Sequence, residues 1–305
     1  MLFSLLMLLL RGCGISQTGN NTKGDDAVKQ KETSEKIKIE TVKTASFSMH
    51  CFKFGHGKKT LVILPGLSVQ SVMGSADAIA EAYGELTDDF TIYVFDQRKE
   101  LPNIYTVSDM AKDTAEAFEA AGLDKVNIFG ASLGGMTAME IAIMHPKLVE
   151  KLILGSTSAR ITETEYQTMG NWVELAKEKD VNALYLAFGE AVYPPDVFAQ
   201  LRELLLETAK TITEEDLDRF VILAQSMKNF DITQDLEKIS CPVLAIGDRT
   251  DHVLGAEASK LMEEYLNGRS DFELYMYDGY GHAVYDTAPD FKERMVQFLL
   301  QDAKD

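Results

Sequence analysis

The sequence has few of the residues that build metal and disulfide sites. Its 305 residues include only three cysteines, and Cys13, Cys51 and Cys241 lie far apart along the chain. No Cys-x-x-Cys or His-Glu-x-x-His segment occurs, so neither a disulfide framework nor a metal site is indicated. Cys51 and Cys241 lie in strand-like runs, and we expect them to be small buried apolar thiols.

Positive charge and nucleotide-binding motifs are also scarce. The chain contains 30 Lys and Arg residues and 48 Asp and Glu residues, which gives a net charge of -18 at pH 7. Binding to a phosphate backbone needs clustered Lys and Arg, so we expect no nucleic-acid partner. No Gly-x-Gly-x-x-Gly follows a strand-like run and no phosphate-binding Gly-Lys-Ser/Thr occurs. We therefore predict that the protein uses no cofactor, and no protein partner can be inferred.

The apolar run that begins the chain, Leu2 to Leu10, is too short to span a bilayer but has the size of a signal-peptide core. The segment Leu10-Arg11-Gly12-Cys13 resembles the lipobox of bacterial lipoproteins, in which the cysteine is lipidated and becomes the new N-terminus. Residues 1–13 are thus a candidate signal, and the polar residues 14–36 a tether. The resemblance implies export and a lipid anchor on Cys13. The alternative is a cytoplasmic protein without a functional signal.

Strand-like and helical segments alternate from residue 37 onward. Continuous apolar runs between helical segments indicate a parallel sheet that is covered on both faces. The alternation stops after Ser158, and the residues up to about Glu237 are nearly all helical in pattern before "CPVLAIG" resumes the strands. We predict a core in two parts, 37–158 and 238–305, with a helical cap, 159–237, inserted between them.

The segment "NIFGASLGG" places Ser132 within a cluster of small residues, between a strand-like run and a helical one. Gly-x-Ser-x-Gly is the pattern of a nucleophile elbow, where a sharp turn holds the serine in a strained backbone conformation. Such a serine needs a base to take its proton and a third group to orient that base. Of the five histidines, His282 has the expected setting, because it follows the last apolar strand in the glycine-rich loop "DGYGHAVYD".

Two further groups are needed for acyl chemistry. The loop "GDRTDHV" offers Asp248 and Asp251 as carboxylates that could orient the histidine. Two backbone N–H groups must also point at the developing oxyanion. We assign these to Leu133, at the start of the helix after the serine, and to Leu67 in the Pro-Gly loop, with Ser68 as the alternative to Leu67.

These segments together resemble the α/β-hydrolase superfamily of cap-bearing serine hydrolases over residues 37 to 303. The resemblance rests on the Pro-Gly loop, "FDQR", the elbow "GASLGG", the helical cap, "GDRTDHV" and "GYGH", in this order. It implies the α/β-hydrolase fold, a mostly parallel sheet flanked by helices. In this family the acid lies between nucleophile and base, and we favour Asp251 over Asp248 because Val253 and Leu254 would hold it in place.

The cap and the segment "FDQR" supply the remaining candidates. Aromatic and sulfur-containing side chains of the cap could line a substrate pocket, although helix-spaced aromatic residues are also typical of a core. The pocket candidates are Trp172, Phe188, Tyr193 and Met227. We expect Arg98 to tie loops together and not to bind substrate.

The sequence thus predicts a serine hydrolase that cleaves a carboxylic ester or related acyl bond in a small molecule. Ser132 is the predicted nucleophile, His282 the base and Asp251 the acid. The same triad could serve carbon–carbon bond hydrolysis, acyl transfer or perhydrolysis. From a different class, the fold can serve as a ligand-binding or sensor module with little turnover.

Overall fold

The computed structural model describes residues 36–301, which form a sheet of eight strands in the order β1-β2-β4-β3-β5-β6-β7-β8. Strand β2 runs antiparallel to both of its neighbours, and every other pair is parallel. The strands are β1 (Ile39–Lys43), β2 (Ser48–Phe54), β3 (Lys59–Leu64), β4 (Phe90–Arg98), β5 (Val126–Ala131), β6 (Val149–Gly155), β7 (Val243–Asp248) and β8 (Phe272–Tyr277).

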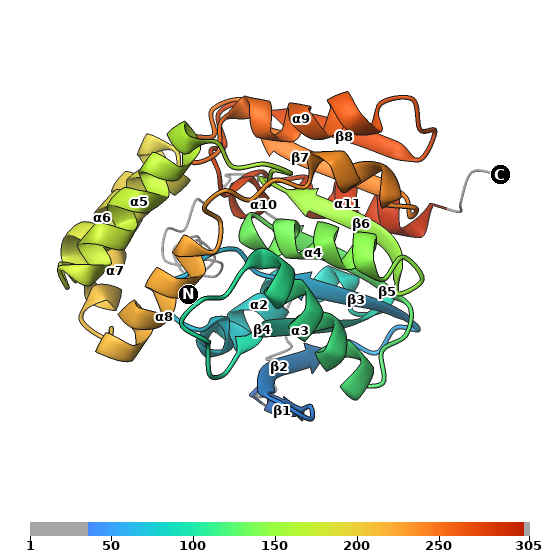
Figure 1. The fold of residues 1–305 in the computed structure, drawn as a ribbon, viewed down its shortest axis with the longest axis horizontal. Helices are drawn as coiled ribbons and strands as arrows, with labels where there is room; N and C mark the ends of the chain where they lie inside the picture. The colour runs from blue at the N-terminus through green and yellow to red at the C-terminus, as the bar shows by residue number, and fades with distance from the viewer. Residues whose placement is uncertain (1–35, 302–305) are drawn as a thin grey trace, which may run out of the picture.

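Helices cover both faces of this sheet (Figure 1). One face carries α3, α4 and α9, and the other carries α2 and α11. The helices of the sheet domain are α2 (Ala76–Ala82), α3 (Val107–Ala120), α4 (Leu133–Met144), α9 (Ala256–Leu266), α10 (Val284–Thr287) and α11 (Phe291–Leu300), with the 3-10 turns η2 (Val72–Ser75), η3 (Gly84–Leu86) and η4 (Thr233–Lys238).

Local sequence explains where these elements begin and how deeply they are buried. Every residue of β5 and β7 is buried, as expected of apolar runs inside a parallel sheet. Helix α3 begins after Thr106, whose hydroxyl accepts from the Asp109 amide while the Asp109 carboxylate accepts from the Thr106 amide. The fold class predicted from the sequence is confirmed. Strand β1 and the short helix α10 were not predicted.

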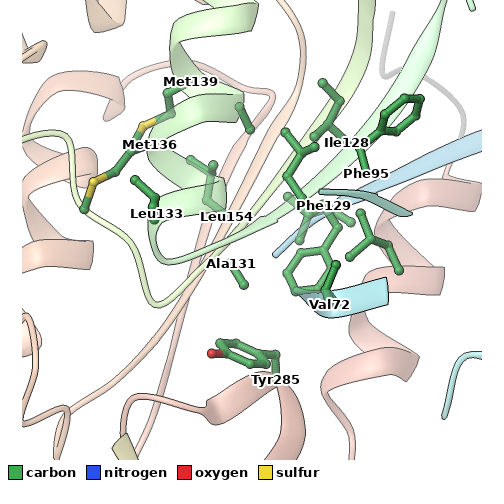
Figure 2. Close-up of a cluster of buried hydrophobic side chains, with 14 of the residues drawn as sticks. Val72, Phe95, Ile128, Phe129, Ala131, Leu133, Met136, Met139, Leu154 and Tyr285 are labelled. Carbon is green, nitrogen blue, oxygen red and sulfur yellow. The ribbon is translucent and has the colours of Figure 1, made fainter. Parts of the chain in front are cut away.

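The core packs around β5. Figure 2 shows Phe129 from this strand with Met136 and Met139 from α4, all fully buried. On the face covered by α11, the Phe129 ring lies 5.5 Å from that of Phe291. The two described cysteines belong to the buried set, with Cys51 2% and Cys241 6% exposed, which confirms the expected buried thiols.

Four helices lie between β6 and β7 and gather beside the sheet as one layer (Figure 1). They are α5 (Glu163–Lys177), α6 (Val181–Val192), α7 (Pro195–Ala209) and α8 (Glu214–Gln225). This insertion is the predicted helical cap. Within residues 36–301, no helix is both long and apolar enough to cross a membrane. Cys13, the predicted signal and all of the predicted tether except residue 36 lie outside the described residues, so the predictions of a signal and a lipid anchor stay predictions.

Candidate active site

Ser132 lies at the sharp turn between β5 and α4, at the carboxyl end of the sheet. Its backbone has φ 50° and ψ -118°, a conformation that side-chain-bearing residues rarely adopt. The neighbouring strand holds this turn in place: the Ser132 amide donates to the Gly155 carbonyl at 2.9 Å, and the Thr157 hydroxyl donates to the Ser132 carbonyl at 2.6 Å. The serine side chain therefore projects from a backbone that is bonded on both sides.

Glycine is required around this turn because backbone passes against backbone. A Cβ atom on Gly134 would lie 2.1 Å from the Leu64 carbonyl oxygen. A Cβ on Gly130 would lie 2.5 Å from the Gly134 carbonyl oxygen. Neither acceptor can move without shifting a strand or a helix, so the small residues of "GASLGG" allow α4 to approach β3 and β5.

His282 lies in the loop after β8 and bridges the serine to a carboxylate. Its Nε2 is 3.0 Å from the Ser132 Oγ, and its Nδ1 is 2.8 Å from the Asp251 Oδ2. All three side chains are buried, with Ser132 and Asp251 7% exposed and His282 3%. The structure thus brings together the three residues that the sequence assigned to nucleophile, base and acid.

Asp251 is fixed by the chain that follows it. Its Oδ1 accepts from the Val253 amide at 2.8 Å and from the Leu254 amide at 3.0 Å. Burial alone would raise the pKa of this carboxyl, but the charge and hydrogen bond of His282 and the two amides outweigh burial and hold the pKa below its ordinary value. Asp251 therefore stays ionised and can orient the imidazole through Nδ1.

Asp248, the alternative acid, is used differently. Its Oδ1 accepts from the Thr250 amide at 2.7 Å and from the Thr250 hydroxyl at 2.5 Å, while its Oδ2 accepts from the Tyr280 amide at 2.9 Å. These bonds tie the loop after β7 to the loop that carries His282. Asp248 thus joins the two loops and does not bond the histidine.

The residues assigned to the oxyanion hole come from two segments, the start of α4 and the loop after β3. Leu133 is the first residue of α4, where the helix dipole favours negative charge. Leu67 follows β3, and Pro65, Gly66, Leu67 and Ser68 line the same pocket as Ser132. Within residues 36–301, neither the Leu67 nor the Leu133 amide donates a hydrogen bond to another residue. Both donors are therefore available to a ligand.

The pocket that contains Ser132 and His282 is lined in part by the cap. All four predicted pocket residues, Trp172, Phe188, Tyr193 and Met227, line it. The rings of Trp172 and Phe188 lie 4.6 Å apart between α5 and α6. These side chains are also almost fully buried, so they belong at once to the core of the cap and to the wall of the pocket.

The segment "FDQR" joins the sheet to the cap. Arg98 pairs with Asp113 of α3 at 3.2 Å and stacks on the Phe47 ring, 4.9 Å from its centroid. As expected, Arg98 ties segments together and does not line the pocket. Asp96 accepts from the Ser71 hydroxyl and pairs at 2.8 Å with Arg219 of the cap helix α8.

Three residues important to this site were not found from the sequence. Thr157 holds the elbow, Arg219 links cap to sheet, and Asp286 lines the pocket beside His282. Thr157 lies in "GSTS" directly after β6. A hydroxyl at the end of a strand next to the elbow could have been recognised in the sequence as a group that bonds the turn. Arg219 pairs with a residue more than a hundred positions away and Asp286 lines a pocket formed by several segments, so no local sequence pattern marks either of them.

This arrangement can activate a hydroxyl. The imidazole of His282 is positioned to take the Ser132 proton at Nε2, while Asp251 at Nδ1 stabilises the imidazolium that would form. Among the described residues nothing accepts from the Leu67 and Leu133 amides, so both could donate to charge that develops on a bound carbonyl. Among the described residues, no group of three or more His, Cys, Asp or Glu side chains could hold a metal ion.

Comparison with known proteins points in the same direction. A family model described as alpha/beta hydrolase fold matches residues 5–289. Among curated proteins, the chain is 28% identical over 255 residues to the putative carbamate hydrolase RutD of Agrobacterium fabrum, covering 80% of this chain and 96% of the relative. The corresponding protein of Rhizobium rhizogenes is 26% identical over 250 residues, covering 79% of this chain and 92% of its own.

Solved structures share the fold at lower identity. MGS-M2, an alpha/beta hydrolase from a Medee basin deep-sea metagenome library, superposes with a TM-score of 0.77 and is 20% identical, covering 87% of this chain and 99% of its own. The enol-lactonase from Burkholderia xenovorans LB400 gives a TM-score of 0.73 at 17% identity, covering 86% and 100% of the two chains. These likenesses concern the fold alone.

Proposed function

Because the chain belongs to the alpha/beta hydrolase fold family and is a hydrolase, we propose that it cleaves a carboxylic ester or related acyl bond through Ser132, His282 and Asp251. The observation that carries this proposal is the hydrogen-bonded chain from Asp251 through His282 to a serine at the floor of a pocket. The substrate is a small molecule with an acyl carbonyl that fits between the serine and the two free amides.

Each group has a defined part in the proposed reaction. The Ser132 oxygen attacks the acyl carbon as His282 takes the serine proton, and the Leu67 and Leu133 amides donate to the resulting oxyanion. The intermediate then expels the alcohol, which receives the proton from His282. A water molecule, deprotonated by the same histidine, attacks the acyl-enzyme and releases the acid. Asp251 stays ionised throughout and holds the imidazole.

Carbamates belong among the candidate substrates. The curated relatives at 28% and 26% identity are named as putative carbamate hydrolases, and a carbamate presents an acyl carbonyl to the serine as an ester does. A matched pair of aryl acetate and aryl carbamate would rank the two classes. A carbamate preference would extend the relatives' named substrate class to this chain.

The test of the proposed triad is covalent labelling. The protein is incubated with a fluorophosphonate, and its intact mass is followed for the wild type, Ser132→Ala and His282→Ala. We expect one adduct on the wild type, none on Ser132→Ala and strongly slowed labelling of His282→Ala. A folded wild type that stays unlabelled, or an adduct that persists in Ser132→Ala, would overturn the proposal. In that event ligand capture without turnover, a sensor function, becomes the better account.

We further propose export with lipidation at Cys13, which rests on the lipobox-like segment alone. Cells that express the full chain would be fed a radioactive fatty acid, with Cys13→Ser as the comparison. Label on the wild type and none on Cys13→Ser is expected. Label retained by the variant would contradict the anchor.

A further inference from the structure

Asp286 is a carboxyl group in the pocket that the proposed reaction does not use. It lies on α10, four residues after His282, and lines the same pocket as His282 and Ser132. Most other lining side chains are apolar, among them Met169, Val192 and Leu254. Asp286 is partly buried, and a carboxylate among apolar side chains is stabilised by a partner of opposite charge, since burying a charge without one is costly.

No residue within 36–301 supplies that partner. The Asp286 side chain forms no hydrogen bond or ion pair with another described residue. Burial raises the pKa of this carboxyl well above its ordinary range, and the positive charge of Lys292 offsets only part of that effect. Lys292 itself lies over the Tyr83 ring, 5.2 Å from its centroid. Burial thus favours the neutral carboxyl group in the empty pocket, and a ligand that carries positive charge would favour the ionised carboxylate and pair with it.

The rest of the pocket favours the same kind of ligand. Of the described residues that line it, none is lysine or arginine, so no cation is present to pair with an anionic substrate. The walls include the rings of Trp172, Phe188 and Tyr193, and aromatic faces attract cations. The net charge of -18 over the whole chain also draws cations and repels anions at long range.

We propose that Asp286 binds a positively charged nitrogen, so that the preferred substrates are esters or related acyl compounds that carry an ammonium group. Asp286 supplies the counter-charge and the aromatic rings pack against the ammonium, while the carbonyl lies at Ser132. Asp286 is thus a specificity-determining residue and takes no part in proton transfer. This inference rests on the proposed function, because it assumes that Ser132 attacks the bound molecule.

The test compares each charged substrate with an uncharged one of the same shape. In the first pair, acetylthiocholine carries the charge on its leaving group, and 3,3-dimethylbutyl thioacetate is its uncharged counterpart. In the second pair, 4-nitrophenyl 6-aminohexanoate carries the charge on its acyl chain, and 4-nitrophenyl heptanoate is its uncharged counterpart. The ratio of kcat/KM for charged over uncharged substrate is measured at one pH for the wild type, Asp286→Asn and Asp278→Asn. Asp278 is an exposed carboxylate in the loop between β8 and α10, outside the pocket, so its variant removes a carboxylate elsewhere.

We expect the wild type to prefer the charged member of at least one pair, and we expect that preference to fall about tenfold or more in Asp286→Asn. Asp278→Asn should keep the wild-type ratio. An unchanged ratio in Asp286→Asn, or a wild type that prefers the uncharged member of both pairs, would overturn the role of Asp286. If both variants lost the preference for the charged substrate equally, the preference would come from the overall charge of the protein, and the role of Asp286 would also be overturned.

A second readout separates this inference from the proposed function. The rate at which Ser132 is labelled by a phosphonate that carries a thiocholine leaving group is compared with labelling by its 3,3-dimethylbutyl isostere. If Ser132 is labelled by both at equal rates, the serine is active and the inference about Asp286 is wrong for the leaving-group side of the pocket. If neither reagent nor a fluorophosphonate labels Ser132, the proposed function itself has failed.

Discussion

The sheet and the cap form the two sides of one pocket by different means. On the sheet side, backbone is packed against backbone, and Gly134 leaves no space for a Cβ atom beside the Leu64 carbonyl. On the cap side, the wall consists of side chains such as Trp172 and Phe188, which can be exchanged without moving a strand. The difference separates two tasks: the sheet fixes the geometry of the reactive groups, and the cap shapes the space for the substrate.

The largest expected effect comes from the carboxylate on the sheet side. Replacing Asp251 with Asn should lower kcat for an aryl ester by about 10⁴-fold, because the imidazole loses the charge that holds it and stabilises its protonated form. Steady-state kinetics on the folded variant would measure this. Asp248→Asn, at the end of β7 and three residues before Asp251, is the matched comparison, and its kcat should fall far less. Equal losses in the two variants would mean that the loop is merely disrupted.

Backbone packing at the elbow gives the next effect. Gly134→Ala would place a Cβ atom 2.1 Å from a carbonyl oxygen, and we expect it to lower the free energy of unfolding by more than about 4 kcal/mol. Gly84→Ala is the control, because nothing lies within 4 Å of a Cβ at that position. Denaturant unfolding measures both. A Gly134→Ala protein as stable as the wild type would contradict the statement that tight backbone packing fixes the sheet side of the pocket.

The junction between sheet and cap should respond more weakly. Arg219 pairs with Asp96 at 2.8 Å, with 17% and 11% of the two side chains exposed. Arg219→Gln should cost about 2 kcal/mol of stability, because the Asp96 carboxylate keeps its burial but loses a charged donor. Arg202→Gln on α7 removes an exposed pair, with 49% and 82% exposure, and should change little. The Tm of both variants is measured by thermal unfolding. Equal decreases in Tm would contradict this ranking.

The smallest effect concerns the buried thiols of the sheet domain. Burial raises the pKa of Cys51 and of Cys241 to about 11. The fold therefore favours the neutral thiol, and each thiol ionises only as the pH rises toward that value. At pH 8, iodoacetamide should leave both residues unmodified in the native protein and modify both in denaturant, as peptide mass mapping would show. Native modification at pH 8 would mean that the sheet domain opens readily.

The sequence predicted the residues of tight turns better than the residues whose role depends on contacts between distant segments, for a physical reason. The elbow and the loops that carry Asp251 and His282 have local signatures, because tight turns restrict which residues can occupy them. Arg219 and Asp286 have no such signature. Their environment is created by segments more than a hundred residues apart or by packing at the pocket wall, and a single sequence does not reveal which helix faces meet.

The central claim, that Ser132 forms an acyl-enzyme with the help of His282, is tested most directly by catching the intermediate. A 4-nitrophenyl ester is mixed with the protein, and the reaction is quenched in acid at short times. The protein is then digested, and the mass of the peptide that contains Ser132 is measured by mass spectrometry. The account predicts a transient acyl mass on Ser132 that rises with the first release of 4-nitrophenol and is absent from Ser132→Ala. Ester turnover that continues in Ser132→Ala at the wild-type rate, or an acyl group found only on another residue, would contradict it.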